Sequence, residues 1–210
     1  MTPGKGAKNL TAPPIPRNAE GSRGIGTARG PGGGSEACME PLDIVVFPDP
    51  VLRRGGKPVA TFDQALRDLA VRMFEAMYAD GGVGLAAPQV AIEQKLLVLN
   101  PKGSKDDRSG ELALVNPRLT RKKGRAFGEE GCLSFPGIYA EVERWVDITI
   151  SYQDLDGKEQ TLQATDWLSR IIQHELDHLD GVLFVDRLTP ADKLRVRGKL
   201  DELQERFARR

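Results

Sequence analysis

Several residue types that define large protein classes are scarce in this sequence. Its 210 residues include two cysteines, two histidines and 6% aromatic residues. The cysteines, Cys38 and Cys132, lie 94 positions apart, which is not the pattern of a disulfide framework and suits a reducing compartment. No stretch approaches the roughly 18 apolar residues of a membrane span. The 30 basic and 30 acidic residues balance to zero, so there is no general attraction to nucleic acid. We therefore expect neither a membrane nor DNA among the partners.

Both histidines lie in one short stretch, His174-Glu175-Leu176-Asp177-His178. Two histidines placed at random would be four apart roughly once in a hundred cases, so the spacing needs a reason. On a helix, residues four apart share a face, and two imidazoles can then converge on one metal ion. Glu175 would sit beside that ion, where a carboxylate can take a proton from metal-bound water. The alternative is a helix that is merely polar, or two core histidines.

The surrounding sequence favours a helix that faces the core. Apolar residues recur at three- and four-residue steps, which predicts an amphipathic helix over 166–180. Thr165 or Asp166 can cap its start, and Gly181 lies where it would end. Glu175 falls among the apolar positions, where an unpaired carboxylate would be costly to bury. A metal site or a buried polar partner would account for it.

A catalytic divalent metal needs about three protein ligands and an open position for water. The long zincin pattern would place a third histidine where Phe184 stands, so that version is excluded. Glu202 or Glu205 remains conceivable, but both lie in a strongly charged terminal stretch that is typical of a solvated helix. Cys132 is the better candidate, because glycines and a proline shape its segment and a thiolate with two imidazoles makes a softer ligand set. Cys38 lies in a glycine-rich leader and is not a candidate.

The segment Gly81-Gly82-Val83-Gly84-Leu85-Ala86-Ala87-Pro88-Gln89-Val90 carries a second motif. Read as Gly-x-Gly-x-x-Ala, it could pass for a dinucleotide fingerprint, which needs a strand before it and a helix after it. A helical pattern precedes it instead, and Pro88 argues against a helix running on from the glycines. What remains is a loop where the backbone can approach a ligand closely, ending in the amide of Gln89.

These two motifs, together with Glu130-Gly131-Cys132-Leu133-Ser134 as a third, closely resemble the three motifs of peptide deformylases in order and approximate spacing. The resemblance covers residues 41 to about 190. The wording Cys-Leu-Ser-Phe-Pro-Gly-Ile-Tyr-Ala is most similar to the plastid-type branch. The main departure is Ala91, where many members have glycine.

The resemblance implies an enzyme that removes the formyl group from the N-terminal formylmethionine of nascent chains and releases formate. It implies that Cys132, His174 and His178 hold the metal, which is usually ferrous iron in the cell, with zinc or nickel able to replace it. Glu175 would act as general base and then general acid.

Further roles follow from the same resemblance. Gln89 and the backbone N–H of Leu133 would donate to the oxygen that becomes negative in the tetrahedral intermediate. Four residues would border the peptide channel and one would supply a basic group near the substrate: Val83, Gly84, Ile138 and Tyr139, and Arg144.

The remaining pattern predicts an α+β domain over 41–210, with antiparallel or mixed strands around the HExxH helix and a helix at the C-terminus. Strand-like runs lie at 44–47, 95–99, 112–115, 146–152 and 159–163, with a hairpin turn at Asp156-Gly157, and helical patterns cover 62–79, 166–180 and 190–208.

Residues 1–40 form a different segment. The first 35 contain nine glycines, five prolines, five basic residues and one acid, Glu20, a composition that predicts disorder. The segment is a transit peptide, which would place the protein in the plastid stroma, or a plain leader or sequence upstream of a start at Met39, which would suit a bacterial-type cytoplasm.

The charge pattern of the helix over 190–208 favours a solvated amphipathic helix, and contact with the ribosome near the exit of the nascent chain is the alternative. A metallopeptidase whose third ligand lies elsewhere is the second hypothesis for function, and a metal-stabilised binding module with a closed four-ligand site is the third.

Overall fold

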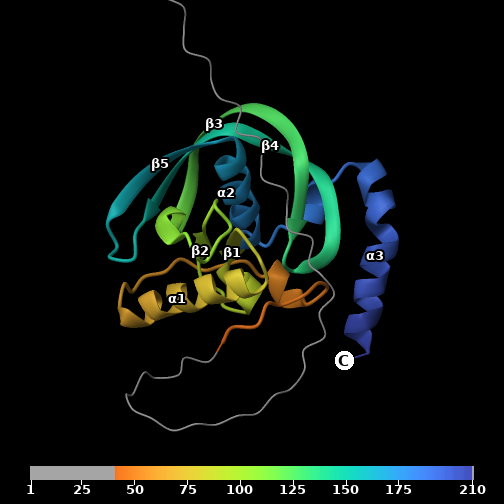
Figure 1. The fold of residues 1–210 in the computed structure, drawn as a ribbon, viewed down its shortest axis with the longest axis horizontal. Coiled ribbons are helices and arrows are strands. Elements are labelled where there is room, and N and C mark those ends of the chain that lie inside the picture. Colours follow the sequence, from red (N-terminus) through yellow and green to blue (C-terminus); the bar gives the residue numbers. More distant parts are fainter. Residues whose placement is uncertain (1–40, 210) are drawn as a thin grey trace, which may run out of the picture.

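The computed structural model describes residues 41–209, and the leader over 1–40 and Arg210 lie outside the described residues. One five-stranded antiparallel sheet runs in the order β1-β2-β3-β4-β5, with three α-helices packed on it (Figure 1). The predicted α+β class is therefore confirmed. The elements are α1 Gln64–Ala79, β1 Gly84–Ala86, β2 Leu96–Leu99, β3 Leu112–Cys132, β4 Phe135–Gln153, β5 Glu159–Thr165, α2 Asp166–Leu179 and α3 Pro190–Ala208, with 3-10 turns at Pro50–Arg53, Ala87–Val90, Arg108–Gly110 and Phe184–Arg187.

The helix α1 begins and faces the core as its sequence predicts. The Asp63 side chain accepts from the backbone N–H of Leu66 at 3.0 Å, which satisfies one of the free donors of the first turn. Its buried residues, among them Met73 and Met77, pack with those of β2 in one core cluster. Leu85 of the short strand β1 belongs to the same cluster, so α1 also packs against β1.

The two long strands β3 and β4 arch over α2 (Figure 1). They pair from Val115↔Gln153 to Cys132↔Phe135, far beyond the predicted runs 112–115 and 146–152. The full length of these strands could not be predicted from the sequence, because residues 118–127 are exposed and mostly polar and show no apolar alternation. The chain turns back between Cys132 and Phe135, which places Cys132 at the end of β3.

The helix α2 is held to the sheet where β5 ends. The first β4–β5 pair is Asp147↔Thr165, so the backbone of Trp145 has no partner on β5. The Gln173 side chain replaces it, since its Oε1 accepts from Trp145 N at 2.9 Å and its Nε2 donates to Trp145 O at 2.8 Å. Because Gln173 directly precedes His174, the same contacts fix the start of the HExxH segment.

The predicted strand at 44–47 is wrong. This stretch is extended but has isolated contacts to two separate segments, with Val45 N donating to Gln89 O at 2.8 Å and Phe47 N to Ser134 O at 2.9 Å. A strand requires a continuous partner, which this stretch lacks. The three helices and the Asp156-Gly157 turn between β4 and β5 agree with the sequence prediction. Within 41–209, no helix has the length and apolar character needed to cross a membrane.

Candidate metal centre and active-site cavity

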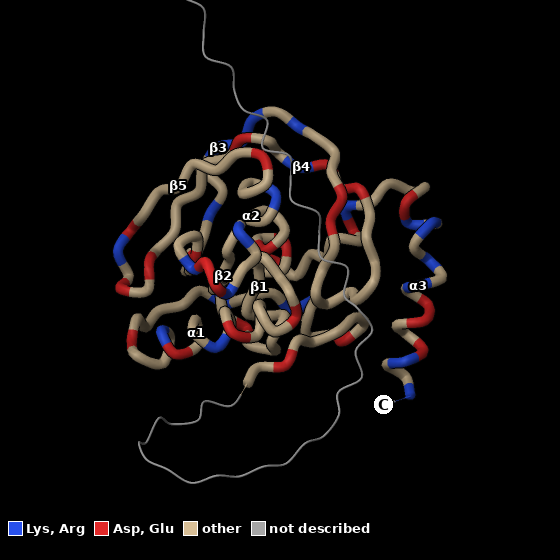
Figure 2. Tube along the Cα trace, viewed as in Figure 1, with Lys and Arg blue, Asp and Glu red and all other residues tan. Residues whose placement is uncertain are grey.

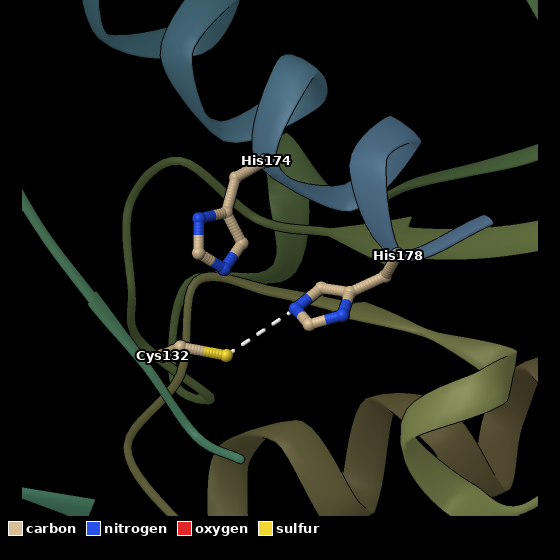
Figure 3. Close-up of side chains that lie close together, drawn as sticks. All are labelled: Cys132, His174 and His178. Carbon is tan, nitrogen blue, oxygen red and sulfur yellow. Dashed lines mark hydrogen bonds between the residues drawn. The ribbon is translucent and has the colours of Figure 1, made fainter. Parts of the chain in front are cut away.

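The three donors expected to hold a metal lie together. One potential ligand atom each from Cys132, His174 and His178 falls within 4.8 Å of the others. Both imidazoles project from successive turns of α2, and the thiol faces them from the end of β3 (Figure 3). The Cys132 Sγ lies 3.2 Å from His178 Nε2. A thiolate with two imidazoles in this arrangement suits a tetrahedral divalent cation with one open position.

Gly131 leaves room for an aromatic ring of β4 beside the backbone of β3. Gly131 pairs with Tyr139 across the β3–β4 ladder. A Cβ on Gly131 would lie 2.5 Å from Tyr139 Cε1 and 2.7 Å from its Cδ1, closer than side chains can pack. The glycine is therefore required for the Tyr139 ring to lie over the backbone next to Cys132.

A buried carboxylate orients His174. Glu130 Oε2 lies 2.9 Å from His174 Nδ1, which leaves the opposite ring nitrogen for a ligand. Arg144 donates to both Glu130 oxygens, at 2.8 and 3.0 Å. Burial alone would raise the pKa of Glu130, but the hydrogen bonds from His174 and Arg144 hold this pKa well below its usual range. Glu130 is thus an anion at neutral pH.

The same charge network continues along α2. Arg144 Nη1 donates to Asp177 Oδ2 at 2.6 Å, and Arg187 donates to Asp177 through two nitrogens, at 3.0 and 2.6 Å. Glu130 also accepts from Arg170 at 2.8 Å. Asp177 lies inside the HExxH segment, so the network ties that turn of α2 to β3 and β4.

The two imidazoles differ in their surroundings. Burial lowers the pKa of His178, and its Nδ1 has no hydrogen-bond partner in the described part of the chain. Burial would also lower the pKa of His174, but its hydrogen bonds with Cys132 and Glu130 raise it well above the usual value. His178 is therefore a neutral ring, and His174 sits among anionic groups. A cation between these rings and the thiol would be stabilised by the same groups, so the residues fit a divalent metal.

Glu175 lies beside the donors and is 4% exposed. Its Oε2 is buried without a hydrogen-bond partner among the described residues, and its other oxygen faces Gly84. Burial raises the pKa of Glu175 to about 7, with the charge of His174 acting in the opposite direction. A carboxylate with a pKa near neutrality can both accept and return a proton.

A cavity of about 220 Å³ opens on this group of residues. Its walls include eight of the eleven residues singled out in the sequence: Val83, Gly84, Gln89, Cys132, Leu133, Tyr139, His174 and Glu175. His178, the third member of the donor cluster, is 1% exposed and is not part of the cavity wall.

Two residues expected near the substrate lie outside the cavity wall. Ile138 is 1% exposed and packs in the core cluster formed by β4, the 3-10 turn Phe184–Arg187 and α3. Arg144 is buried in its ion pairs with Glu130 and Asp177. Both positions follow from strand alternation, which turns these side chains toward the interior.

Among the cavity residues that were not expected from the sequence, three belong to α2. Trp167, Arg170 and Ile171 line the cavity from the first two turns of α2. Trp167, Arg170 and Ile171 precede His174 by seven, four and three residues, and these spacings place side chains on the same side of a helix. This periodicity is the signal that could have identified them.

The Gln89 side chain is held in one orientation. Its Oε1 accepts from Ala86 N at 2.8 Å, which directs Nε2 toward the metal donors. Nε2 lies 3.3 Å from Ser134 Oγ and 3.6 Å from Cys132 Sγ. The amide is therefore a fixed donor at the cavity wall.

The sequence of the chain matches a known protein family. The pattern of the polypeptide deformylase family matches residues 41–194. The chain belongs to the polypeptide deformylase family. A peptide deformylase from Nitrosococcus oceani is 42% identical over 166 residues, covering 79% of this chain and 98% of that protein. Peptide deformylase 1B, chloroplastic/mitochondrial, of Arabidopsis thaliana is 42% identical over 80% of this chain, which spans 61% of that longer protein.

The fold of the family is also shared. A crystal structure of peptide deformylase from Plasmodium falciparum superposes with a TM-score of 0.77 at 41% identity, covering 79% of this chain and 97% of that one. As a deformylase, the chain is a metal-dependent hydrolase that removes the N-formyl group from nascent peptides. Its Cys/His/His site is consistent with one divalent metal ion.

The competing hypotheses have no support in the described residues. Glu202 and Glu205, the alternative ligands of a metallopeptidase, are exposed on α3 and are not part of the donor cluster. A closed structural site would need a fourth donor, and within residues 41–209 the donors form a group of three.

Proposed function

We propose that Cys132, His174 and His178 hold the metal of this deformylase and that Glu175 carries the proton during hydrolysis. One observation carries the proposal: three soft or borderline donors lie within 4.8 Å of one another beside a buried carboxylate oxygen that has no hydrogen-bond partner in residues 41–209. Glu130 supports His174 as a ligand by holding its Nδ1.

The reaction is an addition of water to the formyl carbon followed by departure of the methionine nitrogen. A divalent cation, when bound, supplies a Lewis acid that lowers the pKa of water toward neutrality. The Glu175 carboxylate receives the proton that water loses as its oxygen adds to the formyl carbon. The same carboxyl then returns this proton to the nitrogen as the C–N bond breaks, which yields formate and a free amine.

Gln89 and Leu133 would stabilise the negative charge that develops on the formyl oxygen. The fixed orientation of Gln89 Nε2 supports this role, because a donor that is already aimed needs no reorganisation. Leu133 follows Cys132 at the cavity wall, and its backbone N–H would supply the second donor. Each such donor commonly lowers the barrier by about 3–4 kcal/mol.

The formylmethionyl peptide would lie along the cavity wall formed by Val83, Gly84 and Tyr139. Ile138 and Arg144 would act from behind this wall, Ile138 through core packing and Arg144 through its pairs with Glu130 and Asp177. Arg144 is thus proposed as a positioning residue that holds the support of His174.

The metal in the cell is proposed to be ferrous iron, with zinc or nickel able to occupy the same ligands. A thiolate beside two imidazoles is compatible with each of these ions. Elemental analysis of protein purified without oxygen tests the proposal, and zinc at full occupancy under those conditions would contradict it.

Residues 41–210 are proposed as the catalytic domain and residues 1–40 as a transit peptide to the plastid stroma. The basic, acid-poor composition of the first 35 residues supports this, as does the 42% identity to an Arabidopsis relative named chloroplastic/mitochondrial. If residues 1–40 direct no import, the site of action would be a bacterial-type cytoplasm. Import of a fluorescent protein fused to residues 1–40 into isolated chloroplasts distinguishes the two. The ribosome is the proposed partner, since the substrate is a nascent chain.

The mechanism is tested by formate release from formyl-Met-Ala-Ser at matched metal content. Glu175→Gln keeps the size of the side chain but removes its proton-accepting group. We expect formate release to fall at least 1,000-fold, roughly the upper part of the range for loss of a general base. Activity of Glu175→Gln within tenfold of wild type would refute the role of Glu175.

A further inference from the structure

The strand β3 carries a dense row of positive charge on its free edge. Its pairing with β2 ends at Val115, so residues beyond this point have β4 as their one strand neighbour. Residues 118–125 include five basic side chains and no acidic one, and all of them are exposed. The five are Arg118, Arg121, Lys122, Lys123 and Arg125, which we name the β3 basic row.

Most of this charge is not neutralised. Within the described chain, the ion pair of this row is Arg125 with Glu143, at 2.5 Å. Asp147 lies opposite Lys123 in the ladder, without an ion pair between them. Arg121, Lys122 and Lys123 are consecutive, and Gly124, with a φ of 65°, separates them from Arg125.

The helix α3 shows a different arrangement. Two of its arginines and the residue that follows it form ion pairs along the helix: Arg195 with Asp192 at 2.8 Å, Arg197 with Asp201 at 3.9 Å, and Arg209 with Glu205 at 3.2 Å. Figure 2 shows blue and red segments alternating along α3, whereas blue segments recur on the arch of β3. Lys193, Lys199 and Arg206 of α3 have no ion pair in the described chain, so the two elements differ in composition: acidic residues are interspersed among the basic ones on α3, whereas residues 118–125 of β3 include none.

Aromatic rings accompany the β3 basic row. Lys122 Nζ and Arg125 Cζ lie 5.1 and 4.0 Å from the centre of the Trp145 ring, which restricts the motion of both cations. Phe127, two residues further along β3, is 58% exposed. Ordered cations beside an exposed ring are suited to a ligand that carries phosphates and flat bases.

Lysines on an edge strand also prevent pairing with other sheets. That explanation requires a charge but neither a single sign nor five cations in eight residues. We propose instead that the β3 basic row docks the enzyme on RNA through the phosphate backbone. This inference rests on the proposed ribosome partner, because RNA then surrounds the point where the nascent chain emerges.

The position of the row suits such a role. Arg125 and Cys132 lie seven residues apart on one strand, a separation of about 23 Å. RNA bound at the row would therefore leave the cavity open while keeping the emerging chain near it.

The test measures binding of the full chain to a fluorescently labelled 16-base-pair RNA hairpin by anisotropy over a series of salt concentrations. The triple variant Arg121→Gln, Lys122→Gln and Lys123→Gln removes three charges from the row. The control Arg195→Gln, Arg197→Gln and Arg206→Gln removes three charges from α3 and changes the net charge equally. Formate release from formyl-Met-Ala-Ser is measured for each protein, and we expect it to be unchanged in both variants.

We expect the β3 variant to bind the hairpin at least tenfold more weakly, and the slope of log affinity against log salt to fall by about 2–3. The α3 variant should bind within twofold of wild type. Equal losses in both variants, a loss confined to α3, or no binding by wild type at low salt would each overturn the proposal. Wild type that binds phosphatidylserine vesicles but no RNA would also overturn it. Because formate release is a separate readout, failure of RNA docking leaves the deformylase mechanism untouched.

Discussion

Replacement of Gly84 by alanine should displace the Glu175 carboxylate. A Cβ at Gly84 would lie 2.5 Å from Glu175 Oε1 and 3.0 Å from its Cδ and Cγ. Contacts of 3.0–3.4 Å are already tight, so the oxygen must move by about 0.5–0.9 Å. A misplacement of about 1 Å can cost about 100-fold in rate, and we expect kcat to fall about 10- to 100-fold. The overpacked contact should also lower the free energy of unfolding by about 1–3 kcal/mol.

Formate release from formyl-Met-Ala-Ser measures the rate, and urea denaturation measures stability. Gly198→Ala on α3 is the matched control, because a Cβ there meets nothing within 4 Å. We expect Gly198→Ala to keep full activity and to stabilise the protein by up to about 1 kcal/mol, since alanine is the better helix former. If Gly84→Ala kept wild-type kcat, Glu175 would not depend on this contact and the proposed geometry would be refuted. A rise in KM with unchanged kcat would instead assign Gly84 to substrate binding alone.

Three further predictions concern the metal and the residues that support it. Glu130→Gln should weaken metal affinity about 10- to 100-fold because His174 loses its anionic partner; competition with a chelator measures the affinity, and excess metal should restore most of the activity. Arg144→Met should lower the free energy of unfolding by about 3–5 kcal/mol because Glu130 and Asp177 stay buried with fewer partners; a melting temperature within 2 °C of wild type, measured by calorimetry, would contradict this. Removal of the metal by a chelator should lower the melting temperature by about 8–16 °C, the effect of losing a ligand present at about 1,000 times its Kd; an unchanged value would mean that the ligands hold no metal.

The metal donors could be predicted because their geometry is local. His174 and His178 are joined by the fixed periodicity of a helix, and the amphipathic pattern of 166–180 identified that helix. Cys132 required more, because no local rule brings residue 132 to residue 174. The glycines and proline around it and the softness of a thiolate made it the better candidate, the resemblance of three motifs implied the same ligand, and the structure provides the physical link by ending β3 against α2.

The long strands could not be predicted for a related reason. Residues 118–127 are exposed, so burial imposes no apolar alternation on them, and the pattern used to recognise a strand is missing. Their strand conformation comes from pairing with β4, which is itself partly buried. The expected strand at 44–47 failed in the opposite way, since it has the composition of a strand but no continuous partner.

Arg144 shows why motif-based roles need a structure. The sequence places a basic residue near the substrate, yet its guanidinium lies between Glu130 and Asp177. Each of these acids adjoins a metal donor, Glu130 through its contact with His174 and Asp177 through its place next to His178 in the chain. A buried arginine between two such acids fixes α2 relative to β3 and β4 before any metal arrives. The ligands then need little rearrangement on binding, so the free energy of metal binding can appear as affinity and stability instead of being consumed in ordering the site.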